Sequence, residues 1–144
     1  MKEENKIKIF LVDDNKLFLK ELEIKFLKYQ NFEVVTFLTG EACVKSLKEN
    51  PDVIILDYLL DLTEKTAMNG LQTLDEIKSI QPSIPVIILS AQDKIEVAVN
   101  CMHHKALDYV VKSETAFMRM IKIINDCLQF KKLEKQLTWY MHKM

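Results

Sequence analysis

Five polar side chains end or directly follow short apolar runs, and together they could carry out phosphoryl chemistry. They are Asp13, Asp14, Asp57, Ser90 and Lys112. Three carboxylates held together repel one another and raise one another's pKa values, and a divalent cation relieves that repulsion. A site with only oxygen ligands suits Mg²⁺, which usually keeps several waters. Beside such an ion, an aspartate could act as a nucleophile and form an aspartyl phosphate.

Phosphoryl transfer gives each of these residues a role. Asp57 would be the nucleophile, and Asp13 and Asp14 would bind the metal. Lys112 would neutralise charge on the phosphoryl oxygens, and Ser90 would donate a hydrogen bond to them. Each residue alone has a commoner interpretation: an acidic pair in a turn, a solvated lysine, or a serine that caps the next helix. Their occurrence at the ends of four of the five predicted strands favours a shared site.

The segments that must position these side chains alternate between strand-like and helix-like patterns. Apolar runs that favour strands cover residues 7–12, 33–37, 53–57, 86–89 and 107–111. Helical periodicity predicts helices over 17–29, 41–49, 70–80 and 94–102, with a last helix from about 114. This alternation predicts an α/β fold, with a parallel sheet between two layers of helices. The carboxyl ends of the strands would then bring the polar residues together.

Two of the predicted helices carry informative apolar faces. The face expected to pack the first helix on the sheet consists of Leu17, Phe18, Leu22, Ile24, Phe26 and Leu27, with Glu21 among them. The last helix has one stripe that should dock on the sheet, formed by Phe117, Met120, Ile121, Ile124 and Leu128. A second stripe with heptad spacing points about 180° away, formed by Phe130, Leu133, Leu137, Tyr140 and Met144. This second stripe could be a frayed or folded-back tail, a parallel dimer seam, or a linker to an output domain.

Composition excludes several classes of protein. The 144 residues fit one domain, and 20 basic against 21 acidic side chains give no electrostatic argument for nucleic acid binding. No apolar run approaches the length of a membrane span, and the polar N-terminus does not look like a signal peptide. Cys43, Cys101 and Cys127 lack metal-like spacing and are expected to be buried free thiols, which fits a reducing cytoplasm.

Four segments resemble the receiver domain of two-component response regulators, the CheY-like family. They are IFLVDDN at 9–15, PDVIILD at 51–57, PVIILSA at 85–91 and ALDYVVK at 106–112. The resemblance implies a flavodoxin-like (βα)5 sandwich of three layers, with strand order 2-1-3-4-5. It divides the chain into a receiver domain at 5–128 and a helical extension at 129–144.

The resemblance also implies a function. A sensor histidine kinase or phosphotransfer protein would transfer a phosphoryl group to Asp57, with Mg²⁺ bound by the acidic residues and by the backbone carbonyl of Leu59. Ser90 and Tyr109 would then reorient and remodel the face formed by the fourth helix, fifth strand and fifth helix. A homodimer could form through that face or through the C-terminal helix. The chain would catalyse only its own phosphorylation and dephosphorylation, in the cytoplasm.

Three features depart from the usual receiver pattern. Gly70 comes about five residues late, after an insertion at 61–69 that lies beside the expected site. Ser113 replaces the proline that normally follows the lysine with a cis bond, so a trans bond is expected. Leu59 replaces a residue that is commonly polar, and this position influences how water reaches the phosphoryl group.

Three other functions would explain parts of the sequence. A haloacid-dehalogenase-like phosphatase needs a second aspartate two residues after its nucleophile, where this chain has Leu59, and its nucleophile lies on the first strand. A receiver-like interaction scaffold that is never phosphorylated would be favoured by the altered insertion and Ser113. A nucleotide-binding flavodoxin-like domain needs a glycine-rich phosphate loop, but Gly40 and Gly70 are the only glycines.

Overall fold

The strands form where the sequence is almost continuously apolar. The computed structural model describes residues 6–29, 31–60 and 66–143. Five parallel strands make one sheet in the order β2-β1-β3-β4-β5, as predicted. The strands are β1 (Ile7–Val12), β2 (Phe32–Phe37), β3 (Val53–Asp57), β4 (Val86–Ser90) and β5 (Asp108–Val111). The helices are α1 (Lys16–Leu27), α2 (Gly40–Lys45), α3 (Gly70–Ile80), α4 (Ile95–His103) and α5 (Ala116–Lys143), with a short 3-10 turn η1 (Leu47–Glu49) after α2.

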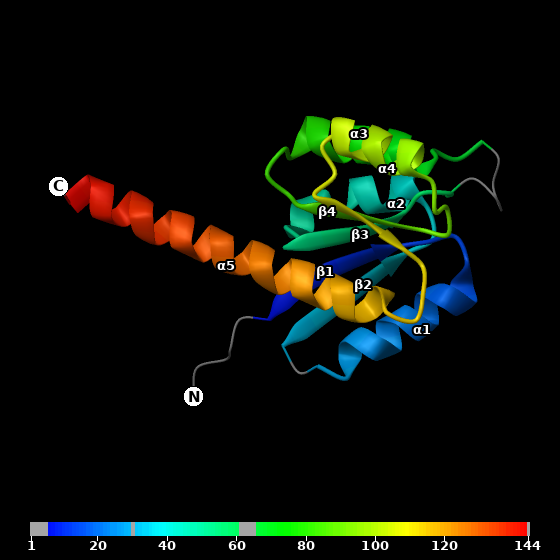
Figure 1. Ribbon diagram of the computed structural model, residues 1–144, viewed down its shortest axis with the longest axis horizontal. Coiled ribbons are helices and arrows are strands. Elements are labelled where there is room, and N and C mark those ends of the chain that lie inside the picture. Colours follow the sequence, from blue (N-terminus) through cyan, green and yellow to red (C-terminus); the bar gives the residue numbers. More distant parts are fainter. Residues whose placement is uncertain (1–5, 30, 61–65, 144) are drawn as a thin grey trace.

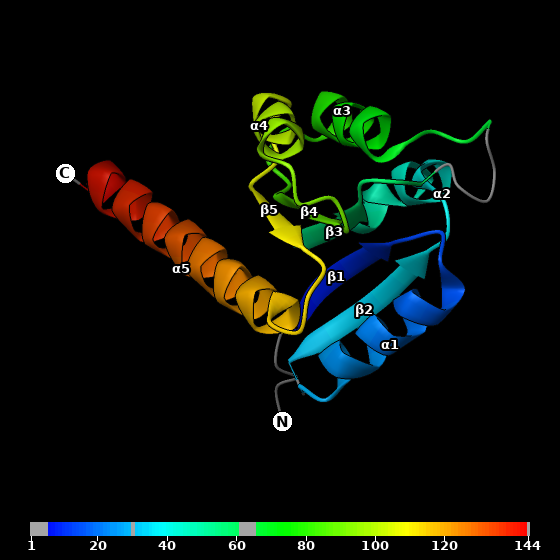
Figure 2. The same ribbon diagram turned by 45° about the vertical axis from the view of Figure 1, so that its right-hand side comes forward.

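The sheet separates two apolar cores because successive side chains of each strand point to opposite faces. In β1, for example, Ile9 and Leu11 join the core under α1 and α5, whereas Phe10 and Val12 join the core under α2, α3 and α4. Figures 1 and 2 show the resulting three layers, with α1 and α5 on one side of the sheet. The predicted three-layer α/β sandwich is confirmed.

The face of α1 that packs on the sheet differs from the prediction. Leu19, Leu22 and Phe26 are buried, whereas Leu17, Ile24 and Leu27 are exposed. At about 100° per residue, Leu17 and Ile24 lie on the side of the helix opposite the buried stripe and Leu27 lies to one side of it, so the prediction was wrong for all three. Apolar residues cover more than half of this helix, and its periodicity alone therefore does not select the buried face.

The second helix and one of the cysteines also differ from the predictions. The helix predicted over 41–49 is a short α-helix followed by the 3-10 turn, and it ends at Asn50, whose φ of 58° lies in the left-handed region. Cys43 and Cys101 are buried free thiols as expected, but Cys127 is only half-buried. Within the described ranges, no helix has the length and apolar character needed to cross a membrane.

The last helix contains 28 residues and runs well past the sheet. Its first part docks as predicted: Met120, Ile121 and Ile124 are buried, and Phe117 and Leu128 pack partly against the same core. Its second part projects away from the domain as one continuous helix (Figure 1). The alternative of a folded-back tail is therefore wrong for the residues up to Lys143.

Candidate functional site

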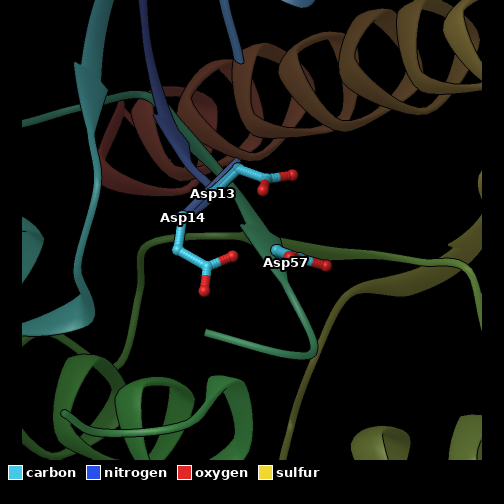
Figure 3. Close-up of side chains that lie close together, drawn as sticks. All are labelled: Asp13, Asp14 and Asp57. Atoms are coloured by element: carbon cyan, nitrogen blue, oxygen red, sulfur yellow. The ribbon is translucent and has the colours of Figure 1, made fainter. Parts of the chain in front are cut away.

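Three carboxylates meet where β1 and β3 end, as Figure 3 shows. The strand register explains this meeting, because Val12 pairs with Leu56 and the next residues along the two strands are Asp13 and Asp57. Asp13 and Asp57 are buried and Asp14 is half-buried. One carboxylate oxygen from each of the three residues lies within 4.8 Å of the other two. The sequence prediction of an acidic cluster at this sheet edge is thus confirmed.

The Lys112 side chain reaches the same cluster from the end of β5. Its Nζ lies 3.2 Å from Asp13 Oδ2 and 3.5 Å from Asp57 Oδ1. Its backbone N–H donates a 2.7 Å hydrogen bond to the Ser90 carbonyl, which ties the residue to the end of β4. All described peptide bonds are trans, including the one before Ser113, as predicted. The missing proline therefore does not move the lysine out of the site.

Burial makes the charged form of Asp57 costly. Desolvation raises the pKa of Asp57 to about 7, and the neighbouring Asp13 carboxylate acts in the same direction. The Lys112 ammonium and a hydrogen bond from the Leu59 backbone oppose this rise in pKa. Three carboxylates whose oxygens lie within 4.8 Å of one another repel, so the cluster favours a positively charged ligand. Oxygen ligands in this number fit a hard divalent cation such as Mg²⁺.

Ser90 and Tyr109 are linked through the connection between β4 and α4. Ser90 is buried, and its Oγ accepts a 3.0 Å hydrogen bond from the backbone N–H of Gln92. The Tyr109 hydroxyl donates a 2.6 Å hydrogen bond to the Gln92 carbonyl. Burial raises the pKa of Tyr109, and a hydrogen bond with Ser90 opposes that rise. Ser90 does not cap α4, whose N-cap is Lys94, so the capping alternative is wrong.

Gly70 closes the loop that follows Asp57 although it comes late in the sequence. Its N–H donates a 3.0 Å hydrogen bond to the Tyr58 carbonyl. A Cβ at this position would lie 2.7 Å from Tyr58 Cα and would also press against the Asp57 carbonyl oxygen. Only glycine lets α3 begin this close to the backbone of the acidic strand. Of the insertion at 61–69, residues 61–65 lie outside the described residues.

The end of this loop is held by a residue that the sequence analysis did not single out. Glu41, in the first turn of α2, accepts a 2.9 Å hydrogen bond from the backbone N–H of Met68. At the next residue, Asn69 begins α3 with a capping box that pairs it with Gln72. The Asn69 and Gln72 spacing is a known helix-start signal and could have been found in the sequence, whereas the Glu41 contact could not.

Two more residues at the site escaped the sequence analysis. The Phe18 ring lies 4.2 Å from Lys112 Nζ, so an aromatic face from α1 contacts the ammonium. Asn15 donates its backbone N–H to Asp13 Oδ1 at 2.9 Å, and its side chain caps α1 by accepting from the Phe18 N–H. An asparagine three residues before an apolar helix position is a cap signal, but no local pattern indicates that Phe18 contacts Lys112.

Comparison with known proteins identifies the family to which this chain belongs. Residues 9–125 match the response regulator receiver domain. The chain belongs to this family. The predicted resemblance is therefore confirmed, and the acidic cluster occupies the strand ends at which the receiver motifs were recognised.

Curated relatives of this receiver are longer proteins. Protein-glutamate methylesterase/protein-glutamine glutaminase of Clostridium acetobutylicum is 34% identical over 116 residues, which are 78% of this chain and 32% of that protein. Probable transcriptional regulatory protein TcrX of Mycobacterium tuberculosis is 29% identical, over 74% of this chain and 43% of that protein. ZraR of Escherichia coli is 31% identical, over 74% of this chain and 23% of that protein. The chain thus spans less than half the length of these relatives, and the activities in their names are those of the whole proteins.

Solved structures share the fold of this receiver. NtrX from Brucella abortus superimposes with a TM-score of 0.77 and 26% identity, over 92% of this chain and 29% of that chain. A BeF3-activated DrrB receiver domain gives 0.70 and 30% identity, over 83% of this chain and 98% of that chain. CheY in the CheX-CheY-BeF3-Mg complex from Borrelia burgdorferi gives 0.73 and 23% identity, over 85% of this chain and 89% of that chain. The flavodoxin-like receiver fold is thus shown.

Proposed function

We propose that this receiver is a phosphoacceptor switch whose Asp57 takes a phosphoryl group from a sensor histidine kinase or a phosphotransfer protein. The observation that supports this most is the Lys112 ammonium, which contacts both Asp13 and Asp57 within the acidic cluster. In the reaction, an oxygen of the Asp57 carboxylate forms a bond to phosphorus while the bond between phosphorus and its donor breaks. Lys112 stands where it can offset the negative charge that arrives with the phosphoryl oxygens.

Magnesium is the cofactor that this donor set fits. Asp13, Asp14 and Asp57 would hold it, together with the backbone carbonyl of Leu59. When bound, the ion supplies the positive charge that Lys112 alone cannot provide and polarises phosphoryl oxygens. The Asn15 N–H fixes one oxygen of Asp13, so that the carboxylate is oriented before any ligand arrives.

The connection through Gln92 offers a path by which the phosphorylation state could be relayed. A phosphoryl group on Asp57 would attract the Ser90 hydroxyl, and Ser90 now accepts the Gln92 N–H. Because Tyr109 donates to the carbonyl of the same Gln92, a shift of this connection would change the environment of the tyrosine ring. Tyr109 is buried in the same core as Cys101 of α4, and the face formed by α4, β5 and α5 would present the change to partners.

We assign residues 5–128 to the receiver domain and 129–144 to an extension that reaches a partner or an output domain. A homodimer could form through the α4-β5-α5 face or through the extension. Direct contact with nucleic acid is not part of the proposal, because the net charge is only −1. We place the signalling reaction in the cytoplasm, where histidine kinases would meet the domain.

The test is phosphorylation by acetyl phosphate in the presence of Mg²⁺, followed by intact mass spectrometry. The expected product carries one acid-labile phosphoryl group. This group should be absent from the Asp57→Asn variant, and also from the wild-type chain when EDTA is present during the reaction. Asp75→Asn serves as the matched control because Asp75 is an exposed aspartate on α3 that contacts only His104 in the described contacts. Circular dichroism checks that all variants keep the fold.

Two outcomes would contradict the proposal. Asp57→Asn that still takes up an acid-labile phosphoryl group would mean that another residue is the acceptor. A folded wild-type chain that binds neither phosphoryl group nor beryllofluoride with Mg²⁺ would favour the interaction scaffold that is never phosphorylated.

A further inference from the structure

The projecting half of α5 exposes apolar side chains that no part of the described domain covers. Beyond Leu128 the helix leaves the sheet and continues to Lys143 (Figures 1 and 2). Exposed large apolar residues are concentrated here, in contrast to the docked first half. A helical segment of about 15 residues is only marginally stable in water unless another surface packs against it. We therefore expect another surface to pack against the projecting half.

Four of these side chains form a continuous stripe, which we call the seam. The seam consists of Phe130, Leu133, Leu137 and Tyr140, with exposed fractions of 63%, 54%, 62% and 62%. Their spacing of three, four and three residues is the a and d pattern of a coiled coil. At about 100° per residue, the seam lies on the side of the helix opposite the residues that dock on the sheet.

The charges beside the seam favour a second copy of the same helix. Three lysines of this segment, at 131, 132 and 135, fall at positions that point away from the seam. The flanking e and g positions hold Gln129, Glu134, Gln136, Met141 and Lys143. In a parallel pair, Gln129 of one copy faces Glu134 of the other, and Gln136 faces Met141. No like charges meet across such a pair, although the segment as a whole is rich in lysine.

The seam begins where the helix leaves the domain. One and two turns further toward the N-terminus, the same side of α5 carries Asp126 and Lys122, which form a 2.9 Å ion pair with each other. These charged residues could not pack in an apolar interface without losing their hydration. Because the seam faces away from the docked side, two copies joined along it hold their receiver domains on opposite sides of the pair. The domains then do not obstruct the contact.

We propose that the seam joins two copies of this chain in a parallel two-stranded coiled coil. Four side chains from each copy would bury on the order of 1,000 Å², near the lower limit for specific interfaces. The dimer should therefore be reversible, with a dissociation constant in the micromolar range. This inference goes beyond the phosphoacceptor function, because the seam shares no residue with the acidic cluster and forms with or without phosphorylation.

Sedimentation velocity of the full chain over a range of concentrations tests the association. The wild-type chain should change from monomer to dimer, and Leu137→Asp should raise the dissociation constant more than tenfold because it places a charge in the centre of the seam. Lys135→Asp is the matched control, since it introduces the same side chain on the opposite face of the same helix and should still dimerise.

Disulfide trapping tests the orientation of the two helices. In a Cys127→Ser background, Phe130→Cys should cross-link to itself under mild oxidation if the helices are parallel. In an antiparallel pair, residue 130 would instead lie beside position 140, so a mixture of Phe130→Cys and Tyr140→Cys chains would cross-link. Cross-linking between Phe130→Cys and Tyr140→Cys chains would overturn the proposal. So would a trimer, a wild-type chain that stays monomeric, or a Leu137→Asp variant that still dimerises.

Discussion

Replacing Gly70 with alanine should displace the acidic strand from its working position. The added Cβ would lie 2.5 Å from the Tyr58 carbonyl oxygen and 2.7 Å from Tyr58 Cα, and it would also press on the Asp57 carbonyl oxygen. All of these atoms belong to the backbone, so no side chain can rotate away. Ordinary contacts between carbon atoms are about 3.5–4.0 Å, so the start of α3 and the end of β3 must separate by roughly 1 Å.

That displacement has two measurable consequences. Forcing a methyl group into a close-packed position typically costs about 1–3 kcal/mol of the free energy of unfolding. A shift of about 1 Å in a reacting group can lower a rate by roughly 100-fold. We therefore expect Gly70→Ala to lose stability in urea unfolding and to be phosphorylated by acetyl phosphate about 100-fold more slowly, because Asp57 immediately precedes Tyr58.

Gly40→Ala separates the two effects. Its added Cβ would meet the side chain of Thr73, with Thr73 Cβ at 2.9 Å, rather than the backbone of the site. Thr73 belongs to α3 and is fully buried beside Gly40 of α2, so this variant should lose similar stability but keep its phosphorylation rate within a few-fold. The reasoning is refuted if Gly70→Ala reacts at the wild-type rate, or if both variants lose activity equally.

Three further predictions concern the charges of the site. Mg²⁺ at ten times its dissociation constant should stabilise the protein over EDTA by about 1.4 kcal/mol in thermal unfolding, and Asp13→Asn should abolish this gain. Lys112→Gln should slow phosphorylation by acetyl phosphate about 100-fold or more, because a neutral amide cannot offset the phosphoryl charge. Phe18→Leu should slow the same reaction several-fold through loss of the aromatic contact with the ammonium; an unchanged rate would show that the ring only packs.

The fold could be predicted because its decisive signals are local. Strands such as β3 and β4 are buried on both faces and read as unbroken runs of valine, isoleucine and leucine. Their polar ends then had to meet, since parallel strands share one carboxyl edge. Because Asp13 and Asp57 each stand at the carboxyl end of such a strand, their meeting can be predicted from the sequence, and the pairing of Val12 with Leu56 brings it about.

What could not be predicted depends on how surfaces meet in three dimensions. The buried face of α1 was misjudged because Leu17 and Leu19 are equally apolar, and only the position of the helix over the sheet buries Leu19. The contact of Phe18 with Lys112 joins residues nearly a hundred positions apart. Gln92 takes part through its backbone, and a backbone role leaves no trace in the identity of the residue.

The two main departures from the receiver pattern are tolerated for one physical reason. Lys112 directly follows a strand whose last residue, Val111, pairs with Ser90, and its own N–H is bonded to the Ser90 carbonyl, so the sheet fixes its position before residue 113 is reached. The late glycine still reaches the end of β3 because its N–H donates a hydrogen bond to the Tyr58 carbonyl. Backbone hydrogen bonds at the strand ends thus hold the site in place despite both departures.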